Sequence, residues 1–409
     1  MVTLRNGMYY DVLTHRIFKR RPSSDNPCLN RPIHRSSVRD RTFSLDSGRA
    51  RRIVLILTER CNLACSYCYA GQGAYGKGSL NRIPDRQIDS ILEYLEETFP
   101  NGIENLQFFG GEPLLETRAI RSICKRAPHC VSIRDSARSV VTNGTVLNEG
   151  ILEVLSIYHI AVTISLDGPA EFHDLYRVFK RGGCGSFSVV TKNVARLASA
   201  GVPVAIQLTV SPAMVQAHAR GQFDVEDFSD LLDNIGVRYV HLSPVIDVLG
   251  GEFSFSEQQL EQLDAFQAQM IAALHARGLM NNAVVEAHRF LTKRECNPGY
   301  CGAGLDELTV DINGDLYPCF MFINKPEFRI GTINKGVTNT ALITQLETNR
   351  KAHSEICERC AIVDSCKACV GASVLENGTV SRPSTTMCRF LNNNYFLGVN
   401  ELIESIRHE

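Results

Sequence analysis

The sequence predicts an α/β protein: a partial (β/α)6 barrel of the TIM type, followed by a smaller cysteine-rich domain. Short apolar strands alternate with amphipathic helices over residues 51–285, and strands separated by helices pair in parallel. Eight of the 15 cysteines lie beyond that region, between Cys296 and Cys388. The first residues follow neither pattern. We therefore divide the chain into 1–50, 51–285 and 286–409.

The composition is that of a globular protein. The chain has 409 residues, of which 44% are hydrophobic and 21% are charged, enough for two or three domains. A net charge of −1 excludes a globally basic nucleic-acid binder, and no apolar run is long enough to span a membrane. The start of the chain lacks a signal-peptide pattern. We therefore expect a cytoplasmic protein without nucleic-acid or membrane partners, whose clustered thiols bind metal rather than form disulfides.

The N-terminal arm, residues 1–50, is basic: the first 52 residues hold 12 Lys and Arg against 4 Asp and Glu. A short hairpin or strand is predicted between Val2 and Phe18, and a loop from Asp25 to Arg41, where prolines exclude a long helix. Two interpretations stay open. The arm is either a solvated tail or a partial leader-binding element whose charge attracts an acidic peptide leader.

Six strands account for the predicted barrel. The first, Ile53 to Thr58, is a continuous apolar run typical of a buried parallel strand. Apolar residues recur at helical spacing from Ile88 to Leu95 and predict an amphipathic helix over 85–98. In such a barrel the chemistry lies at the C-terminal ends of the strands. Beyond about residue 290 we expect short strands and little helix. The other barrel strands are expected at Leu106–Phe109, Arg138–Val141, Ile160–Leu166, Val202–Val210 and Arg238–Leu242, and further helices at 187–200, 224–235 and 255–278, the last of which ends the barrel.

A cysteine-rich loop, LTERCNLACSYCYA, directly follows the first strand. It places Cys61, Cys65 and Cys68 with three and then two residues between them. Three thiolates on one loop can hold three corners of a cubane cluster, whereas fully ligated clusters use four. One iron would therefore stay open for another ligand, as one position does on a catalytic zinc. The alternative is a structural zinc site, although zinc favours paired C-x2-C units.

This CxxxCxxC loop resembles that of the radical S-adenosylmethionine (radical SAM) superfamily. In that family the open iron chelates the amino and carboxylate groups of AdoMet, and one-electron reduction cleaves the sulfonium to a 5′-deoxyadenosyl radical. The resemblance implies that Cys61, Cys65 and Cys68 are catalytic and hold a [4Fe–4S] cluster. It also implies a flavodoxin or ferredoxin-type reductant.

Further segments resemble motifs of the same family, so that the resemblance covers residues 51–245. Gly110-Gly111-Glu112-Pro113 is similar to the GGEP motif that receives the AdoMet ammonium, and Thr142-Asn143-Gly144-Thr145 is similar to its TNG strand end. Ser165 and Asp167 resemble ribose-binding positions, with Arg177 downstream, and Tyr67 resembles the aromatic residue beside the adenine. We therefore expect Glu112 and Asp167 to contact AdoMet rather than to act as core polar residues.

The C-terminal cysteines resemble the SPASM extension of peptide-modifying radical SAM enzymes. They read Cys301-x12-Gly314-x4-Cys319, then Cys357-x2-Cys360-x5-Cys366-x2-Cys369, then Cys388. The resemblance implies two auxiliary [4Fe–4S] clusters, and thus three clusters in all: one on Cys296, Cys301, Cys319 and Cys369, the other on Cys357, Cys360, Cys366 and Cys388.

One departure from the family pattern, which bears on the placement of Cys369, and two alternatives concern these cysteines. The family usually has three residues between the third and fourth cysteines of the central group, and here only Lys367 and Ala368 stand between them. If Cys296 is a spectator, the first auxiliary cluster keeps an open iron for a substrate thiolate. Two zinc sites are the other alternative, because paired C-x2-C units suit zinc.

One residue bears on the reaction. Sulfatase maturases commonly carry an Asp after the cysteine that closes the Gly-x4-Cys unit, whereas Phe320 follows Cys319 here. The segment YPC-x-x-F, followed by Phe328-Arg329-Ile330-Gly331, resembles maturases that crosslink ribosomally synthesised peptides (RiPPs). The resemblance implies an oxidoreductase that abstracts a hydrogen from a precursor peptide and installs an intramolecular crosslink, with a Cys thioether as the expected bond.

Other functions stay open. A formylglycine-forming enzyme of the anaerobic sulfatase-maturase type is the nearest alternative. An electron-transfer iron–sulfur protein would not need the GGEP segment, and a zinc-stapled binding module would be colourless. A full leader-recognition domain does not fit in the first 50 residues, so we expect either a partial element or a separate leader-binding protein.

Overall fold

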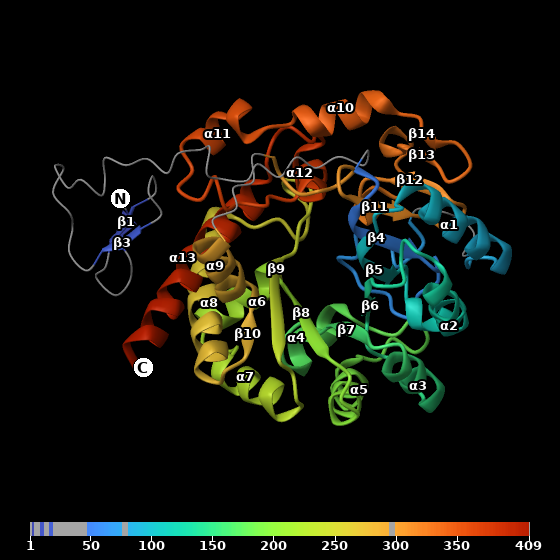
Figure 1. Ribbon diagram of the computed structural model, residues 1–409. Coiled ribbons are helices and arrows are strands. Elements are labelled where there is room, and N and C mark those ends of the chain that lie inside the picture. The colour runs from blue at the N-terminus through green and yellow to red at the C-terminus, as the bar shows by residue number, and fades with distance from the viewer. Residues whose placement is uncertain are drawn as a thin grey trace.

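The computed structural model describes residues 2–3, 9–11, 16–18, 47–75, 81–293 and 299–408. Within these residues the main sheet has 11 strands, in the order β10-β9-β8-β7-β6-β5-β4-β11-β12-β13-β14 (Figure 1). Every neighbouring pair from β10 to β11 is parallel. The predicted α/β fold with a parallel sheet is therefore confirmed.

All six predicted strands are present, with boundaries that move by up to three residues. They are β4 (Ala50–Ile56), β5 (Ile103–Phe109), β6 (Ala137–Thr142), β7 (Ile160–Ser165), β8 (Val204–Val210) and β9 (Tyr239–Pro244). The helices among and after them are α1 (Asp85–Thr98), α2 (Thr117–Arg126), α3 (Glu149–Ile157), α4 (Ala170–Tyr176), α5 (Phe187–Ser199), α6 (Pro212–Ala219) and α7 (Val225–Asn234).

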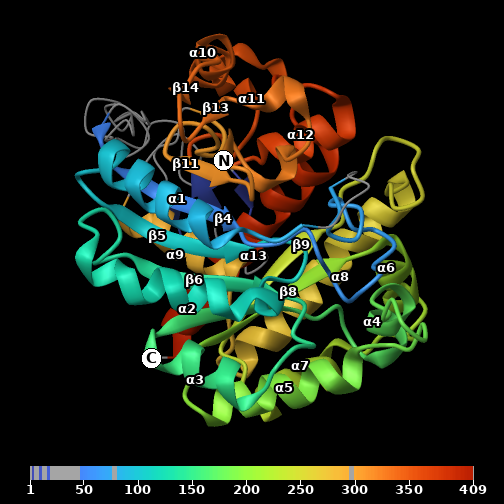
Figure 2. The same cartoon turned by 90° about the vertical axis from the view of Figure 1, so that its right-hand side faces the viewer.

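Alternating burial along the strands positions the site. In β8, Val204, Ile206 and Leu208 are buried, while Ala205 and Gln207 between them are only half-buried. Successive strand residues point to opposite faces, so one face of the sheet packs on helices and the other carries small and polar side chains. Helices α1, α2, α3 and α5 cover the apolar face (Figure 2).

The end of the parallel region differs from the prediction. Helix α8 (Glu257–Ala276) was expected to be the last helix of the barrel, but a further strand, β10 (Met280–Asn281), and helix α9 (Asn282–Lys293) follow it. Gly278, with φ +69°, ends the helical stretch. The side chain of Asn282 then accepts a hydrogen bond from Leu242 N (2.9 Å) and donates one to Leu242 O (3.0 Å). These bonds prolong the pairing with β9, and the predicted boundary at 285–286 falls inside α9.

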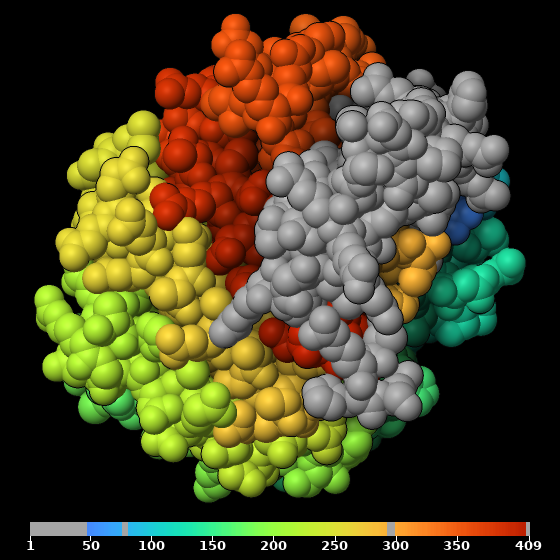
Figure 3. Space-filling view, turned by 90° about the vertical axis from the view of Figure 1, so that its left-hand side faces the viewer, coloured from blue at the N-terminus to red at the C-terminus, as the bar shows by residue number. Residues whose placement is uncertain are grey.

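The expectation of little helix beyond residue 290 was wrong. Helix α13 (Thr385–His408) packs along α8 and α9 (Figure 3), and Gln267 Nε2 donates to Phe390 O at 3.2 Å. Strand β11 (Glu307–Val310) pairs with β4, so the C-terminal region shares the main sheet and core. The remaining C-terminal elements are β12 (Asp315–Tyr317), β13 (Gly331–Thr332), β14 (Gly336–Val337), α10 (Thr340–Thr348), α11 (Glu355–Glu358) and α12 (Val370–Asn377).

At the N-terminus the predicted strand structure is present. Strands β1 (Val2–Thr3), β2 (Tyr9–Asp11) and β3 (Arg16–Phe18) form an antiparallel sheet. The predicted loop from Asp25 to Arg41 lies outside the described residues. Across the part of the chain that the structure describes, no helix is long and apolar enough to cross a membrane.

Candidate functional site

The cysteine loop begins directly after β4. Cys61, Cys65 and Cys68 are free, half-buried thiols. The pKa of the Cys65 thiol is raised to about 11, mainly by burial, which Arg177 opposes and to which the negative charges that Cys68 and Cys61 would carry add. The three thiols are therefore close neighbours that become easier to deprotonate when a cation binds between them.

The GGEP segment lies against the backbone of this loop. Gly111 N donates to Thr58 O (2.8 Å) and Glu112 N donates to Arg60 O (2.7 Å). A Cβ on Gly111 would lie 2.4 Å from Arg60 O, and one on Gly110, whose φ is +149°, would lie 2.5 Å from Thr58 O. Both positions therefore require glycine for steric reasons.

The carboxylate of Glu112 is a buried link between two strand ends. Its exposed fraction is 0%. It accepts hydrogen bonds from Leu114 N (3.0 Å), Thr142 Oγ1 (2.7 Å) and Asn143 N (2.7 Å), and Pro113 begins the 3-10 turn that presents Leu114. Burial raises the pKa of Glu112, while these three bonds lower it. In this arrangement the carboxylate faces protein donors, and the expected contact with AdoMet stays a prediction.

Asn143 joins the neighbouring strand end to the first cysteine. Its Nδ2 donates to Cys61 Sγ (3.7 Å) and to Asn62 Oδ1 (2.9 Å). Asn62 Nδ2 in turn donates to Thr145 Oγ1 (2.8 Å), and Asn143 Oδ1 accepts from Thr145 N (2.9 Å). Sequence reasoning placed the TNG segment at a strand end but missed this contact with the thiol. The available signal was its place on the strand next to the GGEP strand.

Three further predicted residues meet at Cys65. Asp167, which is 1% exposed, accepts hydrogen bonds from Arg177 Nε (2.6 Å), Thr209 N (3.0 Å) and the Tyr67 hydroxyl. The guanidinium of Arg177 lies 5.3 Å from the centre of the Tyr67 ring, and its NH1 is 3.9 Å from Cys65 Sγ. The buried ion pair therefore orients both the tyrosine and the arginine beside the cysteine loop.

Ser165 lies on the same strand end, two residues before Asp167. It is half-buried on β7 and pairs in register with Gln207 of β8. Its hydroxyl is thus on the polar face of the sheet, whereas the oxygens of Asp167 are already occupied by protein donors. Of the two expected ribose contacts, the geometry favours Ser165, and both stay predictions.

A histidine that sequence reasoning missed supports this ion pair. His173 Nδ1 accepts from Asp167 N (3.2 Å), and His173 Nε2 lies 2.9 Å from Ser186 Oγ, which donates to Arg177 O (2.8 Å). Because Ser186 donates elsewhere, His173 must donate through Nε2 and is neutral. Burial lowers the pKa of His173 to about 4, which agrees with the neutral form. A lone histidine on a helix offered no sequence signal for this role.

The C-terminal thiols fall into two spatial groups. Burial raises the pKa of Cys301 to about 12, with Cys369 adding to the rise, and Cys369 and Cys301 act on Cys319 in the same way. In the second group burial raises the pKa of Cys388 to about 12, and Cys366, Cys357 and Cys360 add to it. This is the division of cysteines that the family resemblance implies, whereas cluster binding stays a proposal. Cys296 lies outside the described residues.

The donor set suits iron–sulfur clusters. Each described cysteine is a free thiol, which a thiolate ligand requires. Among the described residues no three His, Cys, Asp or Glu side chains converge on the position of a single metal ion. A four-iron cluster takes one thiolate per iron, so its ligands do not need to converge on one point.

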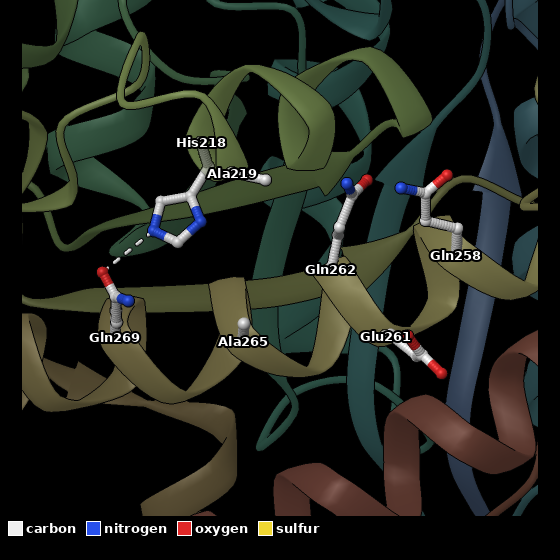
Figure 4. A pocket seen from close by; sticks show the side chains of 7 residues that line it. All are labelled: His218, Ala219, Gln258, Glu261, Gln262, Ala265 and Gln269. Carbon is white, nitrogen blue, oxygen red and sulfur yellow. Dashed lines mark hydrogen bonds between the residues drawn. The ribbon is translucent and has the colours of Figure 1, made fainter.

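A polar pocket elsewhere is separate from these groups. It lies between α6 and α8, where His218 and Gln269 are joined by a 3.0 Å hydrogen bond (Figure 4). Gln258, Glu261 and Gln262 complete its lining together with two alanines. None of the predicted site residues takes part in it.

Comparison with known proteins identifies the domain that carries the cysteine loop. Residues 55–216 match the profile described as Radical SAM superfamily. The chain contains a radical SAM domain. That family implies a [4Fe–4S] cluster and AdoMet, and the matched residues include the cysteine loop, the GGEP segment and Asp167.

Three relatives of this chain are maturation or biosynthesis proteins. The subtilosin biosynthesis protein AlbA of Bacillus subtilis is 25% identical over 76% of this chain and 65% of its own length. The mycofactocin maturase MftC of Mycobacterium ulcerans is 28% identical over 77% and 82%. A serine-type anaerobic sulfatase-maturating enzyme of Klebsiella aerogenes is 24% identical over 75% and 76%. The chain thus spans about two thirds of AlbA.

A solved structure shares the fold. The protein anSMEcpe, in a complex with AdoMet and a peptide named Cp18Cys, aligns with a TM-score of 0.70 at 17% identity, covering 88% of this chain and 99% of that one. The likeness extends beyond the radical SAM domain into the C-terminal region.

Proposed function

We propose that this protein is a radical SAM peptide maturase that abstracts a hydrogen from a ribosomally synthesised precursor peptide and installs an intramolecular crosslink, a Cys thioether. The observation that supports this most strongly is the gathering of Cys61, Cys65 and Cys68, as free thiols, against the GGEP backbone and the Asp167–Arg177 pair at one end of the sheet. Relatives that mature or synthesise peptide products support the substrate class.

In this proposal Cys61, Cys65 and Cys68 hold the cluster, which with AdoMet supplies the radical that removes a hydrogen atom. The chain's own residues orient the site. Asn143 donates to Cys61 and Arg177 lies beside Cys65, and hydrogen bonds to thiolate sulfur stabilise its charge. The backbone of Gly110 and Gly111 packs closely against the cysteine loop and so fixes the thiols relative to the neighbouring strand ends.

The proposal assigns the C-terminal thiols to two auxiliary [4Fe–4S] clusters of a SPASM-type domain. One is held by Cys296, Cys301, Cys319 and Cys369, and the other by Cys357, Cys360, Cys366 and Cys388. A crosslink removes two hydrogens from the peptide: one leaves as the abstracted atom, and the other as a proton and an electron. The clusters would accept that electron. The partners proposed are the peptide, a flavodoxin or ferredoxin-type reductant, and either the basic arm or a separate leader-binding protein.

Aromatic contacts favour crosslinking over formylglycine formation. Phe320, next to Cys319, stacks on Phe109 at 4.6 Å between ring centres and 21° between planes, and lies 5.9 Å from Tyr69, next to Cys68. An apolar ring thus fills the position where a sulfatase-type enzyme commonly carries the aspartate that acts as its base. The alternative, a formylglycine-forming maturase, is supported by the sulfatase-maturating relative and by the shared fold.

The test follows the mass and thiols of a candidate peptide encoded beside this protein. The reconstituted enzyme is incubated anaerobically with AdoMet, reductant and peptide. Loss of two hydrogens together with one alkylatable thiol supports the thioether, and the same mass loss with the thiol retained indicates a different crosslink. Conversion of Cys or Ser to an aldehyde would favour the sulfatase-type alternative. Cys65→Ala should abolish the change, and Cys184→Ala, at an exposed thiol outside the groups, should not.

A further inference from the structure

A group of charged side chains joins β4, which leads into the cysteine loop, to β11 of the C-terminal region. Arg52 of β4 and Glu307 of β11 are register partners in the parallel sheet, and their side chains form an ion pair. Glu307 also pairs with Arg51, whose Nε donates to Asp306 Oδ2 at 3.0 Å. Glu307 is 7% exposed. Glu307 is therefore the buried member of this group, whereas the side chains of Arg51 and Arg52 are 33% and 34% exposed.

The arginine is incompletely bonded. Its terminal nitrogen contacts Glu307, but Arg52 Nε is buried and has no hydrogen-bond acceptor among the described residues. A buried guanidinium nitrogen without a partner is costly, and most such groups in proteins are satisfied by a ligand, water or side chain. An acceptor bound next to Arg52 would satisfy it.

Backbone hydrogen bonds place this ion pair beside two of the C-terminal thiols. Glu307 N donates to the O of Gly302 (2.9 Å), which follows Cys301, and Gly304 N donates to the O of Pro318 (3.2 Å), which precedes Cys319. Burial raises the pKa values of Cys319 and Cys369, and the charge of Arg52 opposes both rises. Glu307 acts in the opposite sense, because its charge adds to the rise at Cys301 and Cys369. The cation and the anion thus both act on Cys369, the cation also on Cys319 and the anion also on Cys301.

We propose that Arg52 is a positioning residue that raises the reduction potential of a cluster held by Cys301, Cys319 and Cys369, and that Glu307 opposes it. This rests on the proposed function, because it requires an auxiliary cluster at these cysteines. Reduction adds negative charge to a cluster, so a neighbouring cation favours the reduced state and a neighbouring anion disfavours it. Arg52 therefore makes this cluster a better acceptor of the electron that crosslinking releases.

The test measures midpoint potentials rather than turnover. Full-length protein carrying Cys61→Ala, Cys65→Ala and Cys68→Ala, so that only C-terminal clusters contribute, is reconstituted and titrated with EPR detection. Adding Arg52→Met should shift one midpoint to lower potential, and Glu307→Gln should shift the same midpoint to higher potential. Arg52→Lys should lie near the parent. Arg49→Met, which removes an exposed pair with Glu104, is the matched control and should shift nothing.

The outcomes separate this inference from the proposed function. Opposite shifts of one midpoint support it, because a purely structural role would shift both variants in the same direction or lose iron in both. If clusters form and neither variant shifts a midpoint, the inference is overturned while the proposed function stands. If the parent binds no C-terminal iron, both are overturned. In the Arg52→Met variant Arg51 still pairs with Glu307. If the Arg52→Met variant is unstable, Glu307→Gln provides a second test.

Discussion

Replacing Glu112 by Gln separates two roles of this carboxylate. In the structure its Oε1 accepts from Leu114 N and Thr142 Oγ1, and its Oε2 accepts from Asn143 N. A glutamine keeps one oxygen, so its NH2 group must face an N–H donor. One buried N–H loses its partner and the remaining bonds lose their charge, which together cost about 2–4 kcal/mol. We therefore expect Glu112→Gln to destabilise the protein even without AdoMet.

The assay combines unfolding of the apoprotein with AdoMet titration of the reconstituted enzyme. The melting temperature should fall by roughly 4–8 °C, at about 2 °C per kcal/mol for a large domain. Glu104→Gln, at an exposed position on β5, the strand that precedes Glu112, should change it little. A direct contact with the AdoMet ammonium would instead lower affinity about ten- to a hundredfold. An unchanged melting temperature with such a loss of affinity would refute the buried-link interpretation.

Three other predictions test the site. Alanine at Cys61, Cys65 and Cys68 together should remove about four of about twelve irons and all deoxyadenosine formation; iron analysis and chromatography measure both, and residual cleavage would contradict the assignment. Asn143→Ala should speed amide exchange in the cysteine loop, because it loses the bonds to Asn62 and Cys61; exchange at the wild-type rate would exclude this link. His173→Gln should flatten the acid dependence of stability. The pKa of His173 falls from 6.5 to about 4 on folding. Its neutral form therefore contributes stability above pH 6.5 that is lost as the pH falls toward 4, about 2 kcal/mol between pH 7 and 5. An equal fall in the free energy of unfolding between pH 7 and 5 for both proteins, measured by urea denaturation, would oppose this.

The parallel sheet could be predicted because its strands are continuous apolar runs. Ile53 to Leu57 is almost wholly buried, and the helix over 85–98 repeats apolar residues with helical spacing. Strand β11 could not be predicted in the same way. Its pairing partner β4 lies about 250 residues earlier in the chain, and four residues carry no periodicity that distinguishes a strand from a turn. Long-range pairing of short segments is set by packing that local sequence does not encode.

The sequence could suggest the residues of the candidate site but not their hydrogen bonding. The spacing of the cysteines indicated the cysteine loop, because metal ligation requires particular residue types, and the family resemblance indicated the GGEP segment. It could not show that Glu112 turns inward, because this depends on the Thr142 hydroxyl and the Asn143 amide arriving from another strand. Nor could it show that Asp167 is already bound by Arg177, Thr209 and Tyr67. Both carboxylates look like free ligands in sequence and are buried links in the structure.

Two separate connections fix the C-terminal thiols relative to the cysteine loop. The first is the β4–β11 ladder, in which Arg52 faces Glu307 while the other end of β4 leads into Cys61. The second is the stacking of Phe320 on Phe109, at the end of the neighbouring strand. A one-residue slip of a strand would turn every side chain to the opposite face, so the ladder admits a single register. With a second contact at the far end of the strands, the C-terminal thiols cannot pivot relative to the cysteine loop about either contact alone. In the proposed function, an electron that passes from the cysteine loop to the C-terminal thiols would therefore cross a distance set by the sheet.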